Sequence, residues 1–216
     1  MEVLITGTSK GIGRATALKF LAEGHTVWGM DVELSSIKHE RYAHYVCNVT
    51  RPDTFPRLDA LEVIVNNAGV QDSGCDIEVN LKGTINITER YAFQPHIKAV
   101  VNVASTSAHN GAEFPEYAAS KGGMLAYTKN VALRLAQYGA TCNSISPGGV
   151  LTDMNYHIIN NPDLWEQVMY ESLIKKWATA EEIAEWIYFV AVVNKSMTAQ
   201  DIIIDNGELA NANFVW

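Results

Sequence analysis

The stretch Glu2-Val3-Leu4-Ile5-Thr6-Gly7-Thr8-Ser9-Lys10-Gly11-Ile12-Gly13 decides the fold of this 216-residue chain. It joins a short apolar run, typical of a buried strand, to a glycine-rich turn with the spacing Gly-x-x-x-Gly-x-Gly. Apolar residues at helical spacing follow as far as Ala22, and Gly24 ends the pattern. A glycine turn between a strand and a helix lets the backbone and the free N–H groups of the helix approach a pyrophosphate. The alternative is a tight turn that binds no ligand.

Apolar runs and helical patterns alternate from one end of the chain to the other. The apolar runs predict strands over residues 2–6, 26–30, 44–47, 62–66, 98–104, 140–146 and 201–205. The clearest helical patterns cover residues 77–93, 116–138 and 180–193. The strands are continuously apolar, as in parallel sheets that carry helices on both faces. We therefore expect an α/β fold with a Rossmann-like, doubly wound parallel sheet, in a single domain over residues 1–216.

Composition and charge exclude several classes of protein. Apolar residues make up 48% and charged residues 19%, which excludes an intrinsically disordered chain. The net charge of −8 argues against binding of nucleic acid or of an anionic membrane surface. The longest apolar run, Trp186 to Val193, is too short to span a bilayer. The N-terminus enters a strand-like run directly, so we expect no signal or transit peptide.

The cysteines indicate a compartment. Cys47, Cys75 and Cys142 are far apart and odd in number, and they form neither a disulfide framework nor a zinc motif. This usage is typical of a reducing environment, so we expect a cytoplasmic protein.

Two residues near the glycine turn bear on the choice of cofactor. Asp31 follows the second strand, 18 residues after Gly13, and a carboxylate there can bind both hydroxyls of an adenosine ribose. It would repel a 2′-phosphate, which favours NAD over NADP. Lys10, inside the turn, favours NADP instead, because a cation can pair with that phosphate. We give Asp31 more weight and therefore expect NAD as the cofactor. The alternative is that Asp31 is an ordinary residue of a surface loop.

Four later residues indicate proton-transfer chemistry. Tyr117 and Lys121 are spaced i, i+4 and share one face of a helix. A nearby ammonium lowers the pKa of a phenol, so such a tyrosine can exchange a proton with a hydroxyl or a carbonyl. Ser105 ends the fifth strand, at the edge where doubly wound sheets bind ligands, and its hydroxyl can donate to an oxyanion. Asn80 lies in the helix after the fourth strand, where its amide is either structural or holds a water of a proton relay.

Together these segments resemble the short-chain dehydrogenase/reductase family over essentially the whole chain. The resemblance is carried by Thr6-Gly7 to Gly13, Asn66-Asn67-Ala68-Gly69, Val79-Asn80-Leu81-Lys82-Gly83, Ser105, Tyr117 with Lys121, and Pro147-Gly148 with Thr152. Each segment is weak alone, and their order on the expected elements makes the combination specific. The resemblance implies a seven-stranded parallel sheet, a nicotinamide cofactor and an Asn-Ser-Tyr-Lys tetrad.

The resemblance also implies roles for individual residues. Tyr117 would be the acid/base, Ser105 would polarise the carbonyl, Lys121 would bind the nicotinamide ribose, and Asn80 would support a water relay. Asn48 stands near the adenine, where the family usually has Asp. Thr152 and the backbone of Val150 would contact the carboxamide. The residues expected at the cofactor are Gly7, Ser9, Lys10, Gly11, Ile12, Gly13, Asp31, Asn48, Val49, Asn67, Ala68, Gly69, Tyr117, Lys121, Pro147, Gly148, Val150 and Thr152.

Three segments depart from the family pattern. Ser105 precedes Tyr117 by 12 residues, fewer than usual, so we align it from the strand side and keep Ser107 as the alternative. The crossover from Asn48 to Leu61 has room for a helix of at most about three turns. Only nine residues, Val70 to Glu78, follow the Asn-Ala-Gly motif before the next one, again fewer than usual. These differences alter the walls of the site and leave the four residues of the tetrad unchanged.

A long segment over about residues 151–178 is expected to be a substrate-binding loop. Its apolar residues either close over a substrate or are buried against the body of the protein; they are Met154, Tyr156, Trp165, Met169 and Trp177. We assign no metal site, because His96 and His157 lack partners at ligand spacing. His109, close to the presumed site, is expected to be a bystander, and the apolar tail from Ala210 to Trp216 is expected to pack on a neighbouring subunit.

These features lead to one function and two alternatives. We expect an NAD-dependent oxidoreductase that transfers a hydride between nicotinamide and a secondary alcohol or ketone. The alternatives are an NADPH-linked 3-oxoacyl thioester reductase and a nucleotide-binding regulator without catalysis. The expected partners are a small alcohol or ketone and further copies of the chain, in a homodimer or homotetramer, because the helix that carries Tyr117 pairs across two-fold axes in the family.

Overall fold

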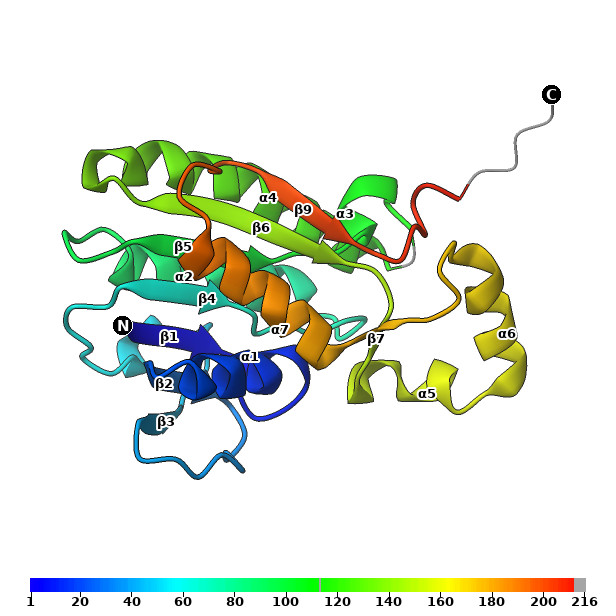
Figure 1. The fold of residues 1–216 in the computed structure, drawn as a ribbon, viewed down its shortest axis with the longest axis horizontal. Helices are drawn as coiled ribbons and strands as arrows, with labels where there is room; N and C mark the ends of the chain where they lie inside the picture. Colours follow the sequence, from blue (N-terminus) through cyan, green and yellow to red (C-terminus); the bar gives the residue numbers. More distant parts are fainter. Residues whose placement is uncertain (113, 212–216) are drawn as a thin grey trace.

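The computed structural model describes residues 1–112 and 114–211 and confirms the expected fold (Figure 1). Seven parallel strands form one sheet in the order β3-β2-β1-β4-β5-β6-β9. The strand order reverses between β1 (Glu2–Thr6) and β4 (Val63–Asn66). In doubly wound sheets the crevice that binds ligands opens beyond the carboxyl ends of the strands at this reversal.

The other strands of the sheet lie close to their predicted positions. They are β2 (Thr26–Asp31), β3 (Tyr42–Val46), β5 (Ala99–Val103), β6 (Thr141–Pro147) and β9 (Asp201–Ile204). All residues of the central strands β4 and β5 are buried. Because helices cover both faces of the sheet, continuous apolar runs rather than alternating patterns marked these strands in the sequence.

Two helices cover each face of the sheet. In Figure 1, α1 (Gly11–Ala22) and α7 (Ala180–Tyr188) lie side by side in front of it. Behind it lie α2 (Gly83–Tyr91) and α4 (Pro115–Leu135). This arrangement leaves the carboxyl edge of the sheet open for a site.

The three predicted helices are confirmed in position, but each one changes helix type along its length. Non-α turns adjoin α2, α4 and α7; they are η2 (Ile77–Lys82) and η5 (Phe189–Val193), which are π-helical, and the 3-10 turn η3 (Ala136–Tyr138). The wider π-helical turn precedes α2 directly and contains Asn80, in keeping with the frequent occurrence of such turns at functional sites.

A hydrophobic core fills the space between the sheet and each pair of helices. Phe20 of α1 and Ile187 of α7 belong to the cluster on one face, and Ile87 of α2 and Leu135 of α4 belong to the cluster on the other. All four side chains are inaccessible to solvent. Each buried side chain of this size contributes roughly 1.5–3 kcal/mol, so the two cores hold the frame of the site rigidly.

The crossover between β3 and β4 contains no α-helix. It contains a single 3-10 turn, η1 (Pro52–Thr54), in place of the short helix for which we left room. Within the described residues, no helix combines the length and hydropathy that crossing a membrane requires.

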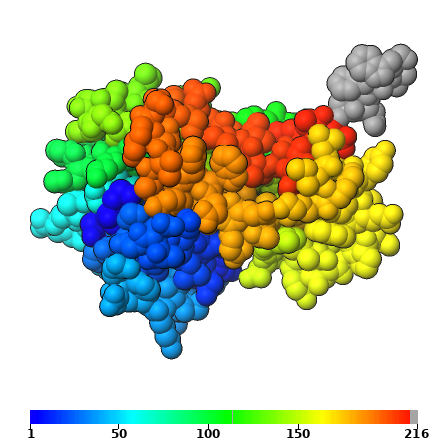
Figure 2. Space-filling model, in the orientation of Figure 1, coloured from blue at the N-terminus to red at the C-terminus, as the bar shows by residue number. Residues whose placement is uncertain are grey.

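The segment expected as a loop over residues 151–178 is largely helical, which corrects the prediction. The short strands β7 (Val150–Leu151) and β8 (Ala178–Thr179) pair in parallel and bracket it. We call the residues between them, 152–177, the lid. The lid contains the turn η4 (Asp153–Asn155) and the helices α5 (Tyr156–Ile159) and α6 (Pro162–Glu171). It forms the projecting yellow end of the molecule in Figures 1 and 2.

The start of α6 has a local cause that the sequence contains. The Asn161 side chain accepts hydrogen bonds from the N–H groups of Asp163 and Leu164, at 3.1 and 3.3 Å. Pro162 occupies the first turn, where its missing N–H costs nothing. Asn161-Pro162 is therefore a helix start within the segment that the sequence pattern predicts as a loop.

Candidate active site

A cleft of about 1040 Å³ lies at the carboxyl edge of the sheet, between the strand ends and the lid. Its size is at the upper end of the range for cofactor sites. Most residues that we expected at the site line this cleft: Gly7, Lys10, Gly11, Ile12, Asp31, Asn48, Val49, Asn67, Ala68, Gly69, Ser105, Tyr117, Lys121, Pro147, Gly148, Val150 and Thr152. Ser9, Gly13 and Asn80 do not line it.

The glycine turn is packed too closely for side chains. A Cβ on Gly13 would lie 2.0 Å from the carbonyl oxygen of Gly7, and one on Gly7 would lie 2.6 Å from Nδ2 of Asn67. Gly7 also has a φ of +75°, which glycine adopts without strain. Lys10 precedes α1 and has no hydrogen-bond acceptor in its side chain. It therefore leaves the first N–H groups of the helix to a ligand or to water.

Asp31 and Glu33 form an acidic rim beside the glycine turn. The backbone N–H groups of Ser9 and Glu33 donate to the two carboxylate oxygens of Asp31, each at 2.9 Å. Nζ of Lys10 lies 2.7 Å from Oε1 of Glu33, and this contact raises the pKa of Lys10. Glu33 lines the cleft, and we had not predicted it. Its signal in the sequence was its place two residues after Asp31, at the end of the same strand.

Asn67 ties the end of β4 to the glycine turn. Its Nδ2 donates to the carbonyl oxygens of Thr6 and Gly7, at 3.0 and 3.3 Å. The backbone N–H groups of Asn67 and Ala68 both donate to Oγ1 of Thr6 at 3.0 Å. These bonds fix the floor of the cleft at Ala68 and Gly69, where small residues leave room for a ligand.

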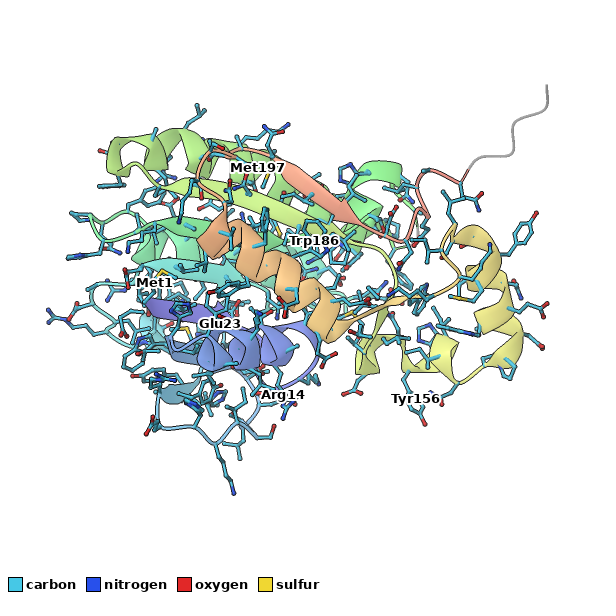
Figure 3. All side chains as sticks on the ribbon, in the orientation of Figure 1. Met1, Arg14, Glu23, Tyr156, Trp186 and Met197 are labelled. Atoms are coloured by element: carbon cyan, nitrogen blue, oxygen red, sulfur yellow. The ribbon has the colours of Figure 1, made fainter. Side chains whose placement is uncertain are left out.

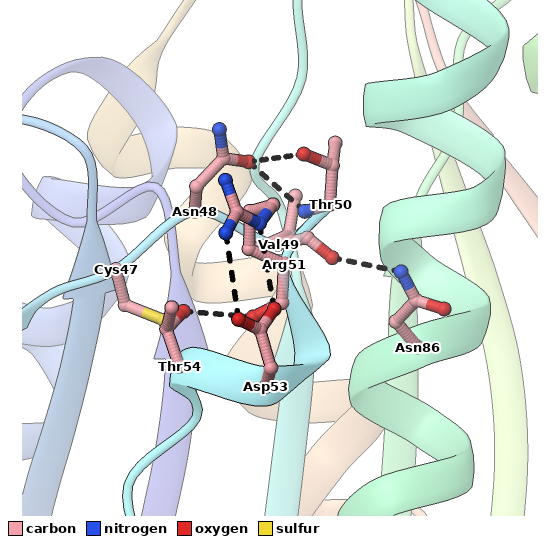
Figure 4. A network of polar contacts seen from close by, with 8 residues as sticks. All are labelled: Cys47, Asn48, Val49, Thr50, Arg51, Asp53, Thr54 and Asn86. Atoms are coloured by element: carbon pink, nitrogen blue, oxygen red, sulfur yellow. Dashed lines mark hydrogen bonds and ion pairs between the residues drawn. The ribbon is translucent and has the colours of Figure 1, made fainter.

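Asn48 and Val49 are held in place at the start of the short crossover (Figure 4). Oδ1 of Asn48 accepts hydrogen bonds from the N–H and the hydroxyl of Thr50, both at 2.9 Å. Nδ2 of Asn86, on α2, donates to the carbonyl oxygen of Val49 at 3.0 Å. In Figure 4 the amide nitrogen of Asn48 points away from Thr50, so this donor is the end that can reach a ligand.

Tyr117 and Lys121 line the cleft from α4. Nζ of Lys121 lies 5.6 Å from the centre of the Tyr117 ring and donates to the carbonyl oxygen of Val103 at 2.8 Å. Burial lowers the pKa of Lys121 to about 8, while the charge of Asp76 acts to raise it. Lys121 is therefore an ammonium at neutral pH, and an ammonium beside a phenol stabilises the phenolate.

Two serine hydroxyls pair at the end of β5. Ser107 begins the short helix α3 (Ser107–Asn110), which we had not predicted. Oγ of Ser105 lies 3.3 Å from Oγ of Ser107 and accepts a hydrogen bond from the Ser107 N–H at 3.2 Å. Both residues are buried and line the cleft. Ser107, the alternative to Ser105 in the sequence, thus orients the Ser105 side chain through its backbone N–H.

Asn80 is fully buried behind Gly69. Its Oδ1 accepts from the N–H of Val70 at 2.8 Å, and its Nδ2 donates to the carbonyl oxygen of Val70 at 2.9 Å and to Oγ of Ser120 at 3.0 Å. Oγ of Ser120 in turn donates to the carbonyl oxygen of Tyr117 at 2.7 Å. Asn80 therefore joins the wall of the cleft to the helix that carries Tyr117. A water of a proton relay could bond the Asn80 side chain only through the second lone pair of Oδ1.

The lid begins and ends against the cleft. A Cβ on Gly11 would lie 3.5 Å from Cγ2 of Thr152, so the start of the lid lies over the glycine turn. At the other end, a Cβ on Gly149 would lie 2.0 Å from the Trp177 indole, which lines the cleft. The Trp165 ring meets Trp177 edge-on, with centroids 5.3 Å apart. This cluster anchors the lid to the body.

The structure separates the apolar lid residues into two groups. Met154 and Trp177 line the cleft. Tyr156 is 66% exposed and points away from the body of the protein in Figure 3. Tyr156 therefore neither lines the cleft nor is buried against the body, so neither of the two expected roles applies to it.

His109 contacts a carboxylate outside the cleft. Its Nε2 lies 2.7 Å from Oδ2 of Asp201, whose Oδ1 accepts from the hydroxyls of Ser144 and Ser146. This contact ties α3 to β9. Among residues 1–112 and 114–211, no cluster of three or more His, Cys, Asp or Glu side chains could hold a metal ion. The expected docking of the tail falls largely on residues 212–216, outside the described residues.

Further residues of the cleft had no signal in the sequence. They come from the residues before α3 and α4, the turn between β6 and β7, the lid and the segment after β9; they include Thr106, Phe114, Gly149, Val168, Glu171 and Glu208. None of them belongs to a motif, and the fold alone brings them together.

The arrangement fits a nicotinamide dinucleotide. The glycine turn and the start of α1 suit its pyrophosphate, and the Asp31 carboxylate suits the adenosine ribose. The phenol of Tyr117, the ammonium of Lys121 and the hydroxyl of Ser105 line the same cleft. The fold and the site thus define a nucleotide-dependent oxidoreductase.

Comparison with known proteins identifies the family. The family model described as enoyl-(acyl carrier protein) reductase matches residues 7–208. A 3-oxoacyl-[acyl-carrier-protein] reductase of Thermotoga maritima is 32% identical, over 94% of this chain and 96% of its own. A 2,3-dihydro-2,3-dihydroxybenzoate dehydrogenase of Escherichia coli is 31% identical, over 98% of each chain. The chain belongs to the short-chain dehydrogenase/reductase family, whose enzymes act on CH–OH groups with NAD(P).

The solved structures support the same fold. A 4-hydroxyisoleucine dehydrogenase mutant complexed with NADH and succinate superposes with a TM-score of 0.89 at 23% identity, over 99% of this chain and 100% of its own. The predicted family, fold class and enzyme class are thereby confirmed, and the regulator without catalysis is set aside.

Proposed function

We propose that this enzyme oxidises a secondary alcohol to a ketone, or reduces the ketone, with NAD. The observation that carries the proposal is the position of the Lys121 ammonium, 5.6 Å from the Tyr117 ring, in the cleft that Ser105 also lines. The substrate oxygen binds between Tyr117 and Ser105. When bound, the nicotinamide ring supplies the acceptor for the hydrogen and the electron pair of the alcohol C–H bond.

Proton transfer belongs to the chain's own residues. Tyr117, as the phenolate, accepts the proton of the substrate hydroxyl, and returns it when the enzyme works as a reductase. Lys121 stabilises that phenolate with its ammonium and binds the nicotinamide ribose. Ser105 donates its hydroxyl to the substrate oxygen, and the Ser107 N–H holds Ser105 in place. Asn80 fixes the position of the wall relative to α4 through its hydrogen bonds to Val70 and Ser120.

The cofactor is held by the expected residues. Gly7, Gly11, Ile12 and the inner Gly13 form the pyrophosphate turn, and Asp31 binds the adenosine ribose hydroxyls. Asn48 and Val49 contact the adenine; the remaining contacts come from Ser9, Lys10, Asn67, Ala68, Gly69, Pro147, Gly148, Val150 and Thr152.

The preference for NAD rests on the acidic rim. Asp31 and Glu33 both line the cleft next to the glycine turn, and Lys10 is paired with Glu33. Two carboxylates against one paired cation repel a phosphate dianion. This pairing reduces the positive charge that Lys10 offers to a 2′-phosphate, which supports the proposal of NAD.

A second candidate is the NADPH-linked reduction of a 3-oxoacyl thioester. The Thermotoga maritima relative, a 3-oxoacyl-[acyl-carrier-protein] reductase, favours it. The carboxylates of Glu171 and Glu208 line the lid side of the cleft and oppose it, because carrier-bound thioesters are anionic. We therefore rank it second.

We place the enzyme in the cytoplasm as a homodimer or homotetramer. Cys47, Cys75 and Cys142 are all free thiols, which suits a reducing compartment. Leu133 on α4 is 78% exposed, which suits a helix that packs on a second copy. The mass of the protein in solution tests this assembly.

The function is tested with a panel of secondary alcohols and NAD, followed by the absorbance of the reduced cofactor. We expect turnover with at least one alcohol, and a loss of roughly 10²–10⁴-fold in kcat for Tyr117→Phe. The matched control is Tyr127→Phe on the same helix, whose hydroxyl bonds Glu89 at 3.0 Å outside the cleft. Full activity of Tyr117→Phe, with NAD binding intact, would remove Tyr117 from its role.

A further inference from the structure

The wall of the cleft after Gly69 is a short turn wrapped around one buried carboxylate. Asp76 is 1% exposed. Its Oδ1 accepts from the N–H of Asp72 at 3.0 Å, and its Oδ2 accepts from the N–H and the hydroxyl of Ser73, both at 2.9 Å. Asp72 and Gly74 have φ values of +50° and +71°. The Asp76 carboxylate thus holds residues 72–76 in a tight turn, at a place where the family has a longer segment.

Asp76 and Asn80 hold the two ends of this wall. They are four residues apart at the start of the same helical segment, so they lie on one face of it. Asp76 fixes residues 72 and 73, and Asn80 fixes Val70 by a hydrogen bond in each direction. Asn80 also bonds Ser120, the neighbour of Lys121. The wall is therefore attached to α4 at Ser120, next to Lys121.

The Lys121 ammonium lies beside Gly69, near the Asn80 side chain. A Cβ on Gly69 would be 3.2 Å from Oδ1 of Asn80 and 3.6 Å from Nζ of Lys121, so the two side chains end at the same glycine. Lys121 is 4% exposed. A buried ammonium is costly without a counter-charge. The groups that act on it are the carbonyl oxygen of Val103 from β5, the Tyr117 ring from α4 and the Asp76 carboxylate from the wall.

We propose that Asp76 is a positioning residue for Lys121: it clips the short wall that Asn80 bonds at Val70, next to Gly69 and the buried ammonium, and it adds a buried negative charge to that wall. The role given to Lys121 here rests on the proposed function. Removing the charge of Asp76 removes a negative charge that favours the ammonium form of Lys121, while burial continues to lower the pKa of Lys121. The same substitution loosens the turn that forms the wall.

The first test reads the charge of Lys121 without turnover. Ligand-free protein with ¹³C-labelled lysine is titrated by NMR, and the Lys121 signal is identified by its loss in Lys121→Met. The midpoint is expected at about pH 8 in the unchanged protein. In Asp76→Asn it is expected about one unit lower. Asp72→Asn, which removes an exposed carboxylate of the same turn, is the matched control and is expected to leave the midpoint in place.

A second variant separates charge from shape. Asp76→Glu keeps the charge and disturbs the clip, so its Lys121 midpoint stays near that of the unchanged protein. If Asp76→Asn titrates like the unchanged protein, or if Asp76→Glu shifts as far as Asp76→Asn, the counter-charge is disproved.

The pH profile of turnover provides the second test. The alkaline limb of kcat/KM is expected to move about one unit lower in Asp76→Asn and to stay in place in Asp72→Asn. A parallel loss of activity at every pH would show a purely structural role and overturn the proposal. If no alcohol is turned over at all, the proposed function fails, and the NMR titration still decides the relation between Asp76 and Lys121.

Discussion

Lys10 and Glu33 meet at the rim of the cleft, with Nζ and Oε1 2.7 Å apart. The contact joins the glycine turn to the segment after β2, next to Asp31. It gives Lys10 a partner of opposite charge, and with Asp31 it leaves the rim with an excess of negative charge. The cation that argued for NADP in the sequence is thus occupied in the structure.

We predict that Glu33→Gln raises the use of NADP relative to NAD. The substitution frees Lys10 to pair with a 2′-phosphate and removes one of two repelling carboxylates. A gain of about 1.4 kcal/mol in this interaction is tenfold in the ratio of kcat/KM values. The two cofactors are compared at fixed substrate, with Glu40→Gln, an exposed neighbour away from the cleft, as control. An unchanged ratio would mean that Lys10 and Glu33 do not select the cofactor.

The buried ammonium of Lys121 makes stability depend on pH. Burial lowers its pKa from the ordinary 10.5 to about 8, so between these values the unfolded chain binds more protons than the folded one. The free energy of unfolding therefore rises with pH through this window. A shift of this size corresponds to about 3 kcal/mol.

Lys121→Met should remove this pH dependence. The variant is expected to unfold at a higher urea concentration than the unchanged protein at pH 7, because it no longer buries a charge, while its turnover is lost. Urea unfolding of the ligand-free protein between pH 7 and 10 measures both slopes. Lys129→Met, at an exposed position of the same helix, should keep the slope. Equal slopes in the unchanged protein and in Lys121→Met would contradict the account.

The lid gives a prediction about a helix cap. Asn161→Ala removes the acceptor of the Asp163 and Leu164 N–H groups and should cost about 1 kcal/mol at the start of α6. Because α6 lies in the lid, we expect faster amide exchange over residues 162–171 and a higher KM for substrate, with NAD binding unchanged. Gln167→Ala, within α6, is the control for loss of a polar side chain. Equal exchange rates in Asn161→Ala and the unchanged protein would show that the cap does not hold the lid.

The sequence was informative where one short segment carries a whole function. Gly7 to Gly13 sets a turn that only glycines can make, and Tyr117 with Lys121 lies on one turn of one helix, so local spacing predicted both. Glu33 was missed because its partner Lys10 is 23 residues away and only the sheet brings them together. The three bonds to Asp76 come from residues that look like any polar loop. The helix α6 was missed although Leu164, Trp165, Val168 and Met169 recur at helical spacing, because the whole segment was assigned to a loop over the substrate.

The close contact within the glycine turn gives the sharpest prediction of all. A Cβ on Gly13 would lie 2.0 Å from the carbonyl oxygen of Gly7 and 2.4 Å from Nδ2 of Asn67, both held by the turn itself. Gly13→Ala must therefore push α1 away from β1, at a cost of roughly 1–3 kcal/mol. We expect a lower Tm and loss of NAD binding in calorimetry. Gly122→Ala is the control, since its Cβ would meet nothing closer than 4.0 Å and should gain roughly 0.5–1 kcal/mol in α4. If Gly13→Ala binds NAD as the unchanged protein does, the turn does not carry the pyrophosphate.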